Sequence, residues 1–156
     1  MDEMSADVAA ETAGARVAAR LSSDYVLRSL LLLAGRYDGE LMTGVVSLAI
    51  IAANTAHLEQ AAGTPQYPDL GEIPPDDLRK PISVLALAGS LGLPFETTRR
   101  HVNRLRKAGR CVRVKGGVIV PAESLRNFDN DAALVANLTN LRRLFRSLAK
   151  AGLDLG

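Results

Sequence analysis

The chain has 156 residues, of which 47% are hydrophobic and 23% charged, a balance that is typical of globular proteins and excludes a disordered chain. This length suits one domain with helical extensions and excludes two large domains. Because the chain has no Trp, three Phe and three Tyr, its core must consist mainly of Leu, Val, Ile and Ala. Such a core favours a mainly α fold.

The net charge of +2 conceals a strong asymmetry along the chain. Residues 1–77 carry a net charge of −8, whereas residues 78–156 carry +10. The stretch from Thr97 to Ala122 contains eight Lys and Arg residues and no acid. This concentration of positive charge is typical of a domain that binds a polyanion through one face.

The first part of the chain is expected to be helical after a flexible leader. Residues 1–21 are Ala-rich, carry few large apolar side chains and form this leader. In the N-terminal helical segment 22–62, a cap at Ser22–Asp24 predicts a first helix that ends at Gly35. A second, more thoroughly buried helix is expected from Glu40 to about Ala61.

Part of this second helix raises the question of a membrane span. Leu41–Leu58 contains no Asp, Glu, Lys or Arg over 18 residues, so a membrane-attached protein is one reading. Several polar residues dilute the stretch, however, and favour a buried helix and no membrane contact. The acidic N-terminus is unlike a secretory signal, and a single Cys excludes a disulfide framework. A cytoplasmic location is therefore expected.

Segment 63–81 is expected to be a linker, because five of the seven prolines lie between Pro65 and Pro81. Segment 82–126 then predicts two short helices, Ile82–Leu91 and Pro94–Ala108, separated by Gly92-Leu93. Ser83 is expected to cap the first of them. In the second helix, the 3, 4, 3 spacing predicts a core-facing side made of Phe95, Thr98, Val102 and Leu105. The Thr98 hydroxyl is expected to bond within the helix.

A β-hairpin and a final helix complete the expected fold. Two strand-like runs, Cys111–Val114 and Val118–Val120, flank a turn at Gly116-Gly117, which predicts a tight hairpin. In the C-terminal segment 127–156, apolar residues recur at a spacing of 4, 3, 4, 3 and predict one helix with a heptad seam. This seam either packs on its own domain or completes a dimer. Its residues are Leu134, Leu138, Leu141, Phe145 and Leu148.

The order helix, tight turn, helix and basic hairpin resembles the winged helix-turn-helix superfamily of bacterial transcription regulators, most nearly MarR-like and related small repressors. The resemblance covers about 40 residues and rests on Leu91-Gly92-Leu93, Thr97–Val102, Leu105 and Ala108-Gly109 with the hairpin that follows. Two residues depart from the family's pattern: Pro94 stands where a capping Ser or Thr is common, and Arg110 replaces an apolar residue.

The resemblance implies a sequence-specific regulator that binds double-stranded DNA. Helix 94–108 would enter the major groove, and the basic wing 110–121 would lie on the DNA backbone. Arg is suited to contact guanine and Asn to contact adenine. Arg and Lys side chains also contact the phosphates. The implied base or phosphate contacts of the helix are Thr97, Arg99, Arg100 and Asn103. The implied phosphate contacts are Arg104, Lys107, Arg113 and Lys115. One recognition helix offers few contacts, so a homodimer is expected.

The sequence is also compatible with other functions. A winged-helix module that binds an acidic protein partner, without a DNA role, is the main alternative. No catalytic or phosphate-loop pattern appears, so neither an enzyme nor a cofactor is expected. The two His have no ligand spacing, and Cys111 is expected to be a small buried hydrophobe rather than a redox sensor. Apolar helices near Tyr25 and Leu41 suit either core packing or a pocket for an unknown small-molecule effector.

Overall fold

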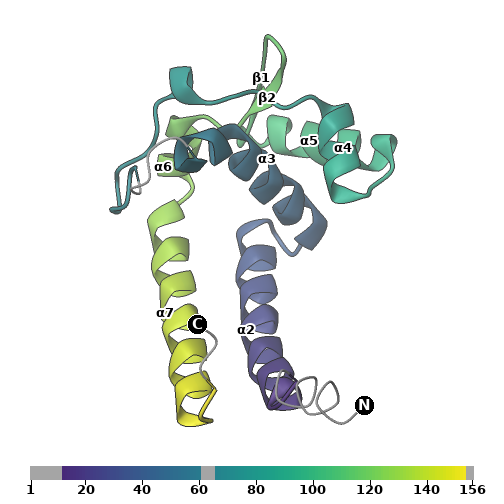
Figure 1. Ribbon diagram of the computed structural model, residues 1–156. Helices are drawn as coiled ribbons and strands as arrows, with labels where there is room; N and C mark the ends of the chain where they lie inside the picture. Colours follow the sequence, from purple (N-terminus) through teal and green to yellow (C-terminus); the bar gives the residue numbers. More distant parts are fainter. Residues whose placement is uncertain (1–11, 61–65, 154–156) are drawn as a thin grey trace. The chain divides into compact units, whose positions relative to one another are not determined.

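The computed structural model describes residues 12–60 and 66–153 (Figure 1). Within these ranges the protein is mainly helical and carries a small antiparallel hairpin, which confirms the expectation of a mainly α protein with a small β element. Residues 1–11 of the expected leader, 61–65 of the expected linker and 154–156 lie outside the described residues. The elements in chain order are α2 (Ala15–Arg36), α3 (Leu41–Gln60), the short 3-10 helix η1 (Asp76–Leu78), α4 (Val84–Leu91), α5 (Phe95–Lys107), β1 (Val112–Val114), β2 (Gly117–Ile119), α6 (Ala122–Asn127) and α7 (Asn130–Lys150).

The chain forms two compact units. The larger unit is Leu32–Leu134, and the smaller one combines the described residues before it, 12–31, with those after it, 135–153. Two segments far apart in the sequence therefore share one unit, a division that the linear pattern of the sequence does not reveal.

Helix α3 is the centre of the larger unit. It packs against α4, α5 and β2 (Figure 1), and Val46 and Ile50 on its inner face are fully buried. The side chains that cover this face come from three elements: Leu87 from α4, Val102 from α5 and Val118 from β2. These aliphatic residues match the aromatic-poor core that the composition predicts, and the expected burial of this helix is confirmed along that face.

The two predicted short helices are confirmed, although α4 begins at Val84, two residues later than expected, because Ile82 pairs with β2. The Ser83 hydroxyl oxygen accepts a hydrogen bond from the backbone N–H of Ala86 (3.1 Å), which caps α4. Gly92 ends α4 with φ 64°, in the left-handed region that glycine adopts without strain. Pro94 precedes α5 and offers no side-chain cap, as expected of a residue that departs from the usual pattern.

The predicted hairpin is confirmed, although β2 begins at Gly117, which was expected in the turn. Val112 lies opposite Ile119, Arg113 opposite Val118 and Val114 opposite Gly117. In addition, the backbone of Ile82, just before α4, pairs with Val118 by two hydrogen bonds (2.9 and 3.2 Å). The hairpin is thus anchored by its second strand to the start of the two-helix segment.

The described part of the linker, residues 66–81, is irregular apart from η1, as its prolines predict, and it is held at its C-terminal end. The side chain of Arg79 is fully buried, and its Nη2 donates to the carbonyl of Pro74 (2.9 Å). Burial lowers the pKa of Arg79, while nearby Asp76 opposes that shift. Asp76 also accepts a hydrogen bond from the backbone N–H of Ala122 (2.7 Å). The C-terminal end of the linker is therefore packed against the rest of the larger unit.

Helix α2 differs from the expectation at both ends. It begins at Ala15 rather than at the predicted cap, so part of the expected leader is helical, and it continues through Gly35 to Arg36. The expected cap residues lie inside the helix instead. The hydroxyls of Ser22 and Ser23 donate to the carbonyl of Ala19, and Asp24 pairs with Arg28. The Ala-rich sequence favours this extension.

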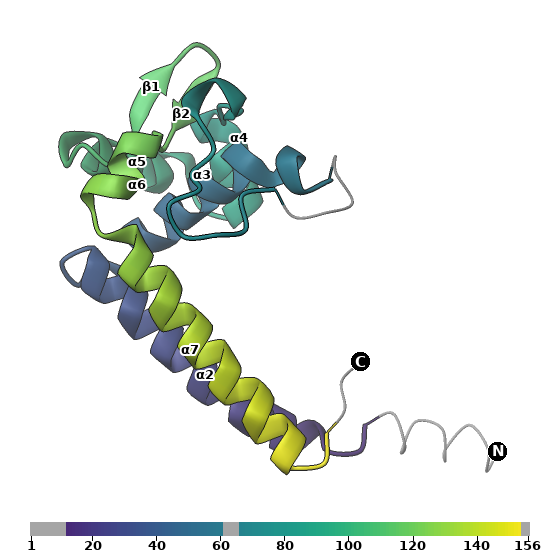
Figure 2. The same cartoon turned by 90° about the vertical axis from the view of Figure 1, so that its left-hand side faces the viewer.

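In the smaller unit α2 and α7 run side by side in opposite directions (Figures 1 and 2). The hydroxyl of Tyr25 donates a hydrogen bond to Oδ1 of Asn137 (3.0 Å), so these residues mark the sides on which the helices face each other. The predicted C-terminal helix is confirmed, but its seam is mostly uncovered. Leu148 is buried, whereas Leu134, Leu138 and Phe145 are 47, 46 and 65% exposed.

Candidate nucleic-acid interface

Helix α5 presents one face to the core and leaves a cationic face uncovered. Thr98, Val102 and Leu105 are buried, as predicted, and the Thr98 hydroxyl donates to the carbonyl of Pro94 (3.2 Å). The prediction that Phe95 also faces the core is wrong, because its ring is 44% exposed. Phe95 is the first residue of α5, and the packed turns follow it.

The predicted recognition residues occupy the sides of α5 that the core does not cover. Arg99, Arg100, Arg104 and Lys107 are exposed, whereas Thr97 and Asn103 are half-buried. Helical periodicity places Arg100, Asn103 and Lys107 on the side opposite the buried residues. Arg100 and Lys107 therefore lie outermost on the helix, and the half-buried Asn103 borders them.

Two of the predicted cations on α5 already have acidic partners. Arg99 forms a two-pronged ion pair with Glu96, with its Nη2 2.8 Å from Oε2, and this pair raises the pKa of Arg99. Both side chains are more than half exposed, so the pair restrains Arg99 without hiding it. Glu96 was expected to favour the helix N-terminus, and its position in the first turn of α5 agrees with that role.

Arg104 differs from its expected role as a free phosphate contact. Its Nη1 forms an ion pair with Glu40, next to the start of α3, and also lies 3.4 Å from the Thr43 hydroxyl. No local sequence pattern indicates this pairing, because Glu40 lies far from Arg104 in the chain and belongs to its acidic half. Arg104 therefore turns toward α3, while Arg100 and Lys107 remain unobstructed.

His101 joins the same side of α5 to α3. Its Nδ1 lies 2.9 Å from the hydroxyl of Thr43, which is itself buried. Burial lowers the pKa of His101, and the positive charges of Arg104 and Arg100 lower it further, while Glu40 opposes them. Its expected structural role is consistent with this position.

The lowered pKa of His101 predicts a stability that falls in mild acid. The unfolded chain takes up a proton on this residue near pH 6.5, whereas the folded protein resists it, so the free energy of unfolding decreases as the pH falls through 6.5. We expect His101→Gln to remove this part of the pH dependence. Urea unfolding at pH 7.5 and 5.5 measures it. An equal loss in both proteins would assign the effect to other groups.

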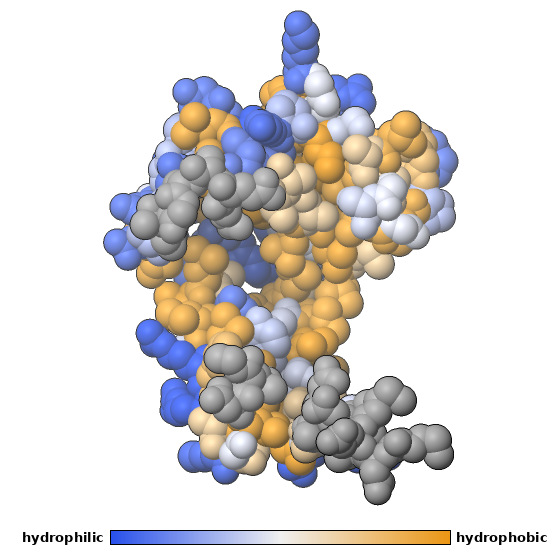
Figure 3. Space-filling model, viewed as in Figure 1, coloured by the Kyte–Doolittle hydropathy of each residue, from blue (hydrophilic) through white to orange (hydrophobic). Residues whose placement is uncertain are grey.

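The hairpin adds two cations beyond α5. Arg113 on β1 and Lys115 in the turn are exposed, as expected for backbone contacts of a wing. Val112 and Val114 lie on the other face of β1, 40 and 36% exposed. Figure 3 shows the corresponding hydrophilic tip at the end of the hairpin.

Arg110, which was expected to belong to the basic wing, is engaged elsewhere. Its guanidinium stacks between the rings of Tyr37 and Phe128, at 4.5 and 4.0 Å from their centroids. Its Nη2 donates to the carbonyl of Arg36 (2.8 Å), and its own carbonyl accepts from the Ser124 hydroxyl. The physical reason is that two aromatic faces and a carbonyl replace water around the cation. Position 110 therefore precedes the hairpin strands, and its guanidinium is engaged by residues of the fold.

This stacking predicts that Arg110 contributes to stability. Replacing it by Leu removes two cation-π contacts and one charged hydrogen bond, so we expect the free energy of unfolding to fall by about 2 kcal/mol. Arg113→Leu, at an exposed position of β1, should change it by less than about 0.5 kcal/mol. Chemical denaturation of both variants makes the comparison. Equal effects would show that the stacking does not stabilise the fold.

Cys111 is buried, which confirms its expected place as a small hydrophobe. Its side chain is 2% exposed, and its Sγ lies 3.7 Å from the carbonyl of Val102. Burial raises the pKa of the thiol to about 11, so little reactive thiolate forms near neutral pH. These properties argue against a redox sensor at this position.

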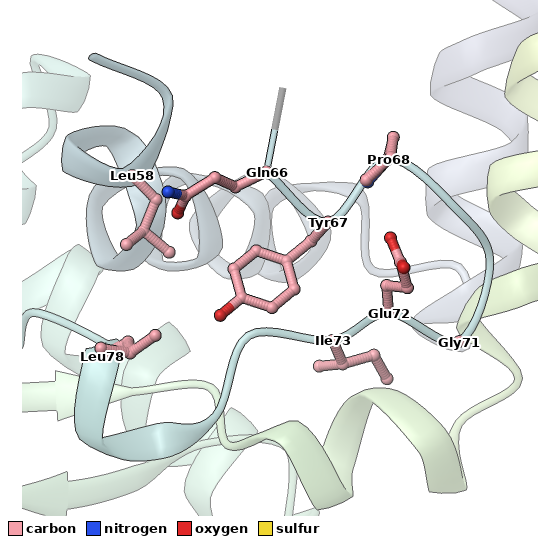
Figure 4. Close-up of a pocket in the computed structure, with 8 residues that line it drawn as sticks. All are labelled: Leu58, Gln66, Tyr67, Pro68, Gly71, Glu72, Ile73 and Leu78. Atoms are coloured by element: carbon pink, nitrogen blue, oxygen red, sulfur yellow. The ribbon is translucent and has the colours of Figure 1, made fainter. Parts of the chain in front are cut away.

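A hollow of about 740 Å³ lies beside the linker (Figure 4). Leu58 at the end of α3, the ring of Tyr67 and Leu78 of η1 line it, together with Glu72. The Glu72 carboxylate accepts a hydrogen bond from the backbone N–H of Asp69 (3.1 Å), within the same loop. Tyr25 and Leu41, the residues near which an effector pocket was considered, do not line this hollow.

Other kinds of site receive no support from the described residues. In ranges 12–60 and 66–153, no group of three His, Cys, Asp or Glu side chains is placed to hold a metal ion. One helix there, α3 over Leu41–Leu58, has the length and apolarity to cross a membrane. The same helix carries the buried core residues Val46 and Ile50.

The candidate interface therefore consists of the outer face of α5 and the exposed cations of the hairpin. Comparisons of the chain with models of protein families, with curated proteins and with solved structures found no match.

Proposed function

We propose that the larger unit contains a winged helix-turn-helix and that the protein is a transcription regulator that binds double-stranded DNA. The order of α3, the paired Ile82, α4, α5, β1 and β2 supports this proposal. In this arrangement the two helices of the motif are packed on α3, and the backbone of Ile82 ties the wing to the start of the motif.

The observation that carries the proposal is the uncovered cationic face of α5 next to an exposed basic hairpin. Arg100 and Lys107 have no acid partner among the described salt bridges, and Asn103 lies between them on the same face. A helix of this width fits the major groove, where Arg and Asn read base edges. The absence of acids from Thr97 to Ala122 suits a surface that approaches phosphates.

The geometry refines the roles proposed for the individual residues. Arg100 and Asn103 are the best placed for base contacts, and Lys107, Arg113 and Lys115 for phosphate contacts. Arg99 is restrained by Glu96 and Thr97 is half-buried, so both suit contacts at the edge of the helix. Arg104 would have to exchange its pairing with Glu40 for a phosphate.

We propose a cytoplasmic, non-catalytic protein that binds DNA as a homodimer, because one recognition helix offers few contacts. For Leu41–Leu58 we propose a core helix and not a membrane span. The fully buried Asn54, whose side chain bonds to the backbone of other segments, supports this choice.

Selection of bound fragments from a randomised duplex DNA pool tests the proposed function. We expect the full chain to enrich a palindromic motif with half-sites about 10 base pairs apart, and the triple variant Arg99→Ala/Arg100→Ala/Asn103→Ala to lose that enrichment. A matched control, Arg16→Ala/Arg20→Ala on exposed positions of α2, removes the same number of positive charges. This control should keep the motif.

The outcomes separate the two classes of function. Loss of the motif in the triple variant alone would support sequence reading by α5. Weak enrichment of all sequences, equal in the three proteins, would leave only unspecific electrostatics and contradict the proposal. That result would favour the alternative of a winged-helix module that binds an acidic protein.

A further inference from the structure

Glu40 brings a negative charge to one flank of α5. It directly precedes α3, in the same unit as α5, and its carboxylate forms an ion pair with Nη1 of Arg104. The stretch 97–122 contains no acid of its own. Among the described residues, α5 forms one other salt bridge, which joins Arg99 to Glu96 within the helix. Folding therefore adds to this basic surface an acid that its own sequence lacks.

Arg104 lies at the edge of the outer face of α5. It follows Arg100 by four residues and precedes Lys107 by three, the spacings at which side chains are neighbours on a helix surface. Its side chain is 54% exposed, so it is within reach of solvent and of a large ligand. Free of its partner, Arg104 would continue the row of cations formed by Arg100 and Lys107. The pairing with Glu40 removes one charge from that row.

The ion pair is held in place from the side of α3. The backbone N–H of Glu40 donates to the carbonyl of Tyr37 (2.8 Å), and its own carbonyl accepts from the N–H of Gly44 (3.2 Å). The start of a helix also favours a carboxylate at this place. Nη1 of Arg104 lies 3.4 Å from the hydroxyl of Thr43, whose residue is 3% exposed. Both partners are thus positioned by the first turn of α3.

A DNA phosphate would compete with Glu40 for Arg104, since both groups are anions that pair with a guanidinium. Glu40 has the advantage of belonging to the same folded chain, so its pairing costs no loss of a partner's free motion. A phosphate that took Arg104 would also leave the Glu40 carboxylate unpaired beside a polyanion, where like charges repel. Both effects favour the ion pair over a phosphate contact.

We propose that Glu40 withholds Arg104 from the phosphates of duplex DNA and thereby limits the affinity of the proposed interface. Glu40 is a positioning residue, because it acts through the guanidinium that it holds. The limit applies to every base sequence, since phosphate contacts carry no sequence information. This inference rests on the proposed DNA-binding function and names the residue that sets its electrostatic strength.

The salt dependence of binding tests this role, because each phosphate contact adds about −0.9 to the slope of log K against log salt concentration. The probe is a fluorescently labelled duplex of random sequence, titrated between about 50 and 200 mM salt. We expect Glu40→Gln to steepen the slope by about 0.9 and to tighten binding about 8-fold at about 0.1 M salt, one tenfold step below 1 M. The double variant Glu40→Gln/Arg104→Ala should return to the wild-type slope.

Asp38→Asn is the matched control. Asp38 is exposed two residues before Glu40, and no salt bridge of the described residues includes it. Its φ of 53° suits Asn, so the substitution removes the same charge without straining the backbone. This variant should keep the wild-type slope.

Three results would overturn the inference while wild-type binding stands: an unchanged slope in Glu40→Gln, a gain that persists in the double variant, or an equal gain in Asp38→Asn. The second and third would assign the effect to general repulsion between acids and DNA. No binding by any of the proteins at about 50 mM salt would contradict the proposed DNA-binding function itself, and with it this inference. Circular dichroism verifies the fold of each variant.

Discussion

Replacing Asn54 by Ala is expected to cause the largest loss of stability among the changes considered for this protein. The side chain of Asn54 is fully buried in α3 and joins the linker to the hairpin. Its Nδ2 donates to the carbonyls of Lys80 (2.7 Å) and Val118 (3.3 Å), and its Oδ1 accepts from the backbone N–H of Val120 (3.0 Å). Alanine would leave these groups without that partner.

The expected magnitude follows from the cost of buried groups that lose their hydrogen bonds. Each such group costs about 1–3 kcal/mol, so we expect Asn54→Ala to lower the free energy of unfolding by at least about 3 kcal/mol. The matched control is Asn137→Ala on α7, which removes one half-buried bond with Tyr25 and should cost about 1 kcal/mol. Urea denaturation of both variants measures the difference. Similar values for the two would contradict the role assigned to Asn54.

The second large effect is expected at Gly117, at the start of β2. Its φ is 148°, in a region that other residues rarely adopt, and a Cβ at this position would lie 2.2 Å from the carbonyl oxygen of Ile82. Because that oxygen belongs to the backbone that pairs with Val118, it cannot move without breaking the pairing. We expect Gly117→Ala to lower the free energy of unfolding by about 2–4 kcal/mol and to weaken any function of the wing.

A second glycine provides the control for this substitution. Gly89 lies within α4, and a Cβ added there would meet nothing within 4 Å. Gly89→Ala should therefore stabilise the protein by about 0.5–1 kcal/mol, because alanine favours a helix over the unfolded chain. Thermal unfolding of the two variants should shift in opposite directions. A destabilised Gly89→Ala variant would show that the surroundings of α4 are tighter than described.

Local sequence signals predicted most of the elements correctly. Ser83 and Gly92 bound α4, and the 3, 4, 3 spacing identified the buried residues Thr98, Val102 and Leu105 of α5. Hairpin position followed from the Gly116-Gly117 turn between two β-branched runs. These features depend on the backbone conformation and helical periodicity of a few neighbouring residues. They can therefore be predicted without the tertiary structure.

The errors at the ends of helices have a common cause. Ser22, Ser23 and Asp24 have the chemistry of a cap, but their side chains bond to residues already inside α2. Whether such a residue caps a helix or continues it depends on the conformation of the preceding residues. The error at Phe95 has a different cause: the spacing pattern places it on the buried side of α5, but the pattern does not show how far the core extends toward the first turn of the helix.

The sequence by itself determined the mainly α fold, the hairpin and the concentration of positive charge on one helix and its wing, because composition, local spacing and charge order express these properties directly. Only the tertiary structure decided which cations remain available. Arg104 pairs with Glu40, which lies 64 residues earlier in the chain. Arg110 stacks on Tyr37 and Phe128, which lie before and after it in the chain. Such long-range contacts depend on how the helices pack. The packing of α7 beside α2 also leaves most of the predicted heptad seam of α7 uncovered.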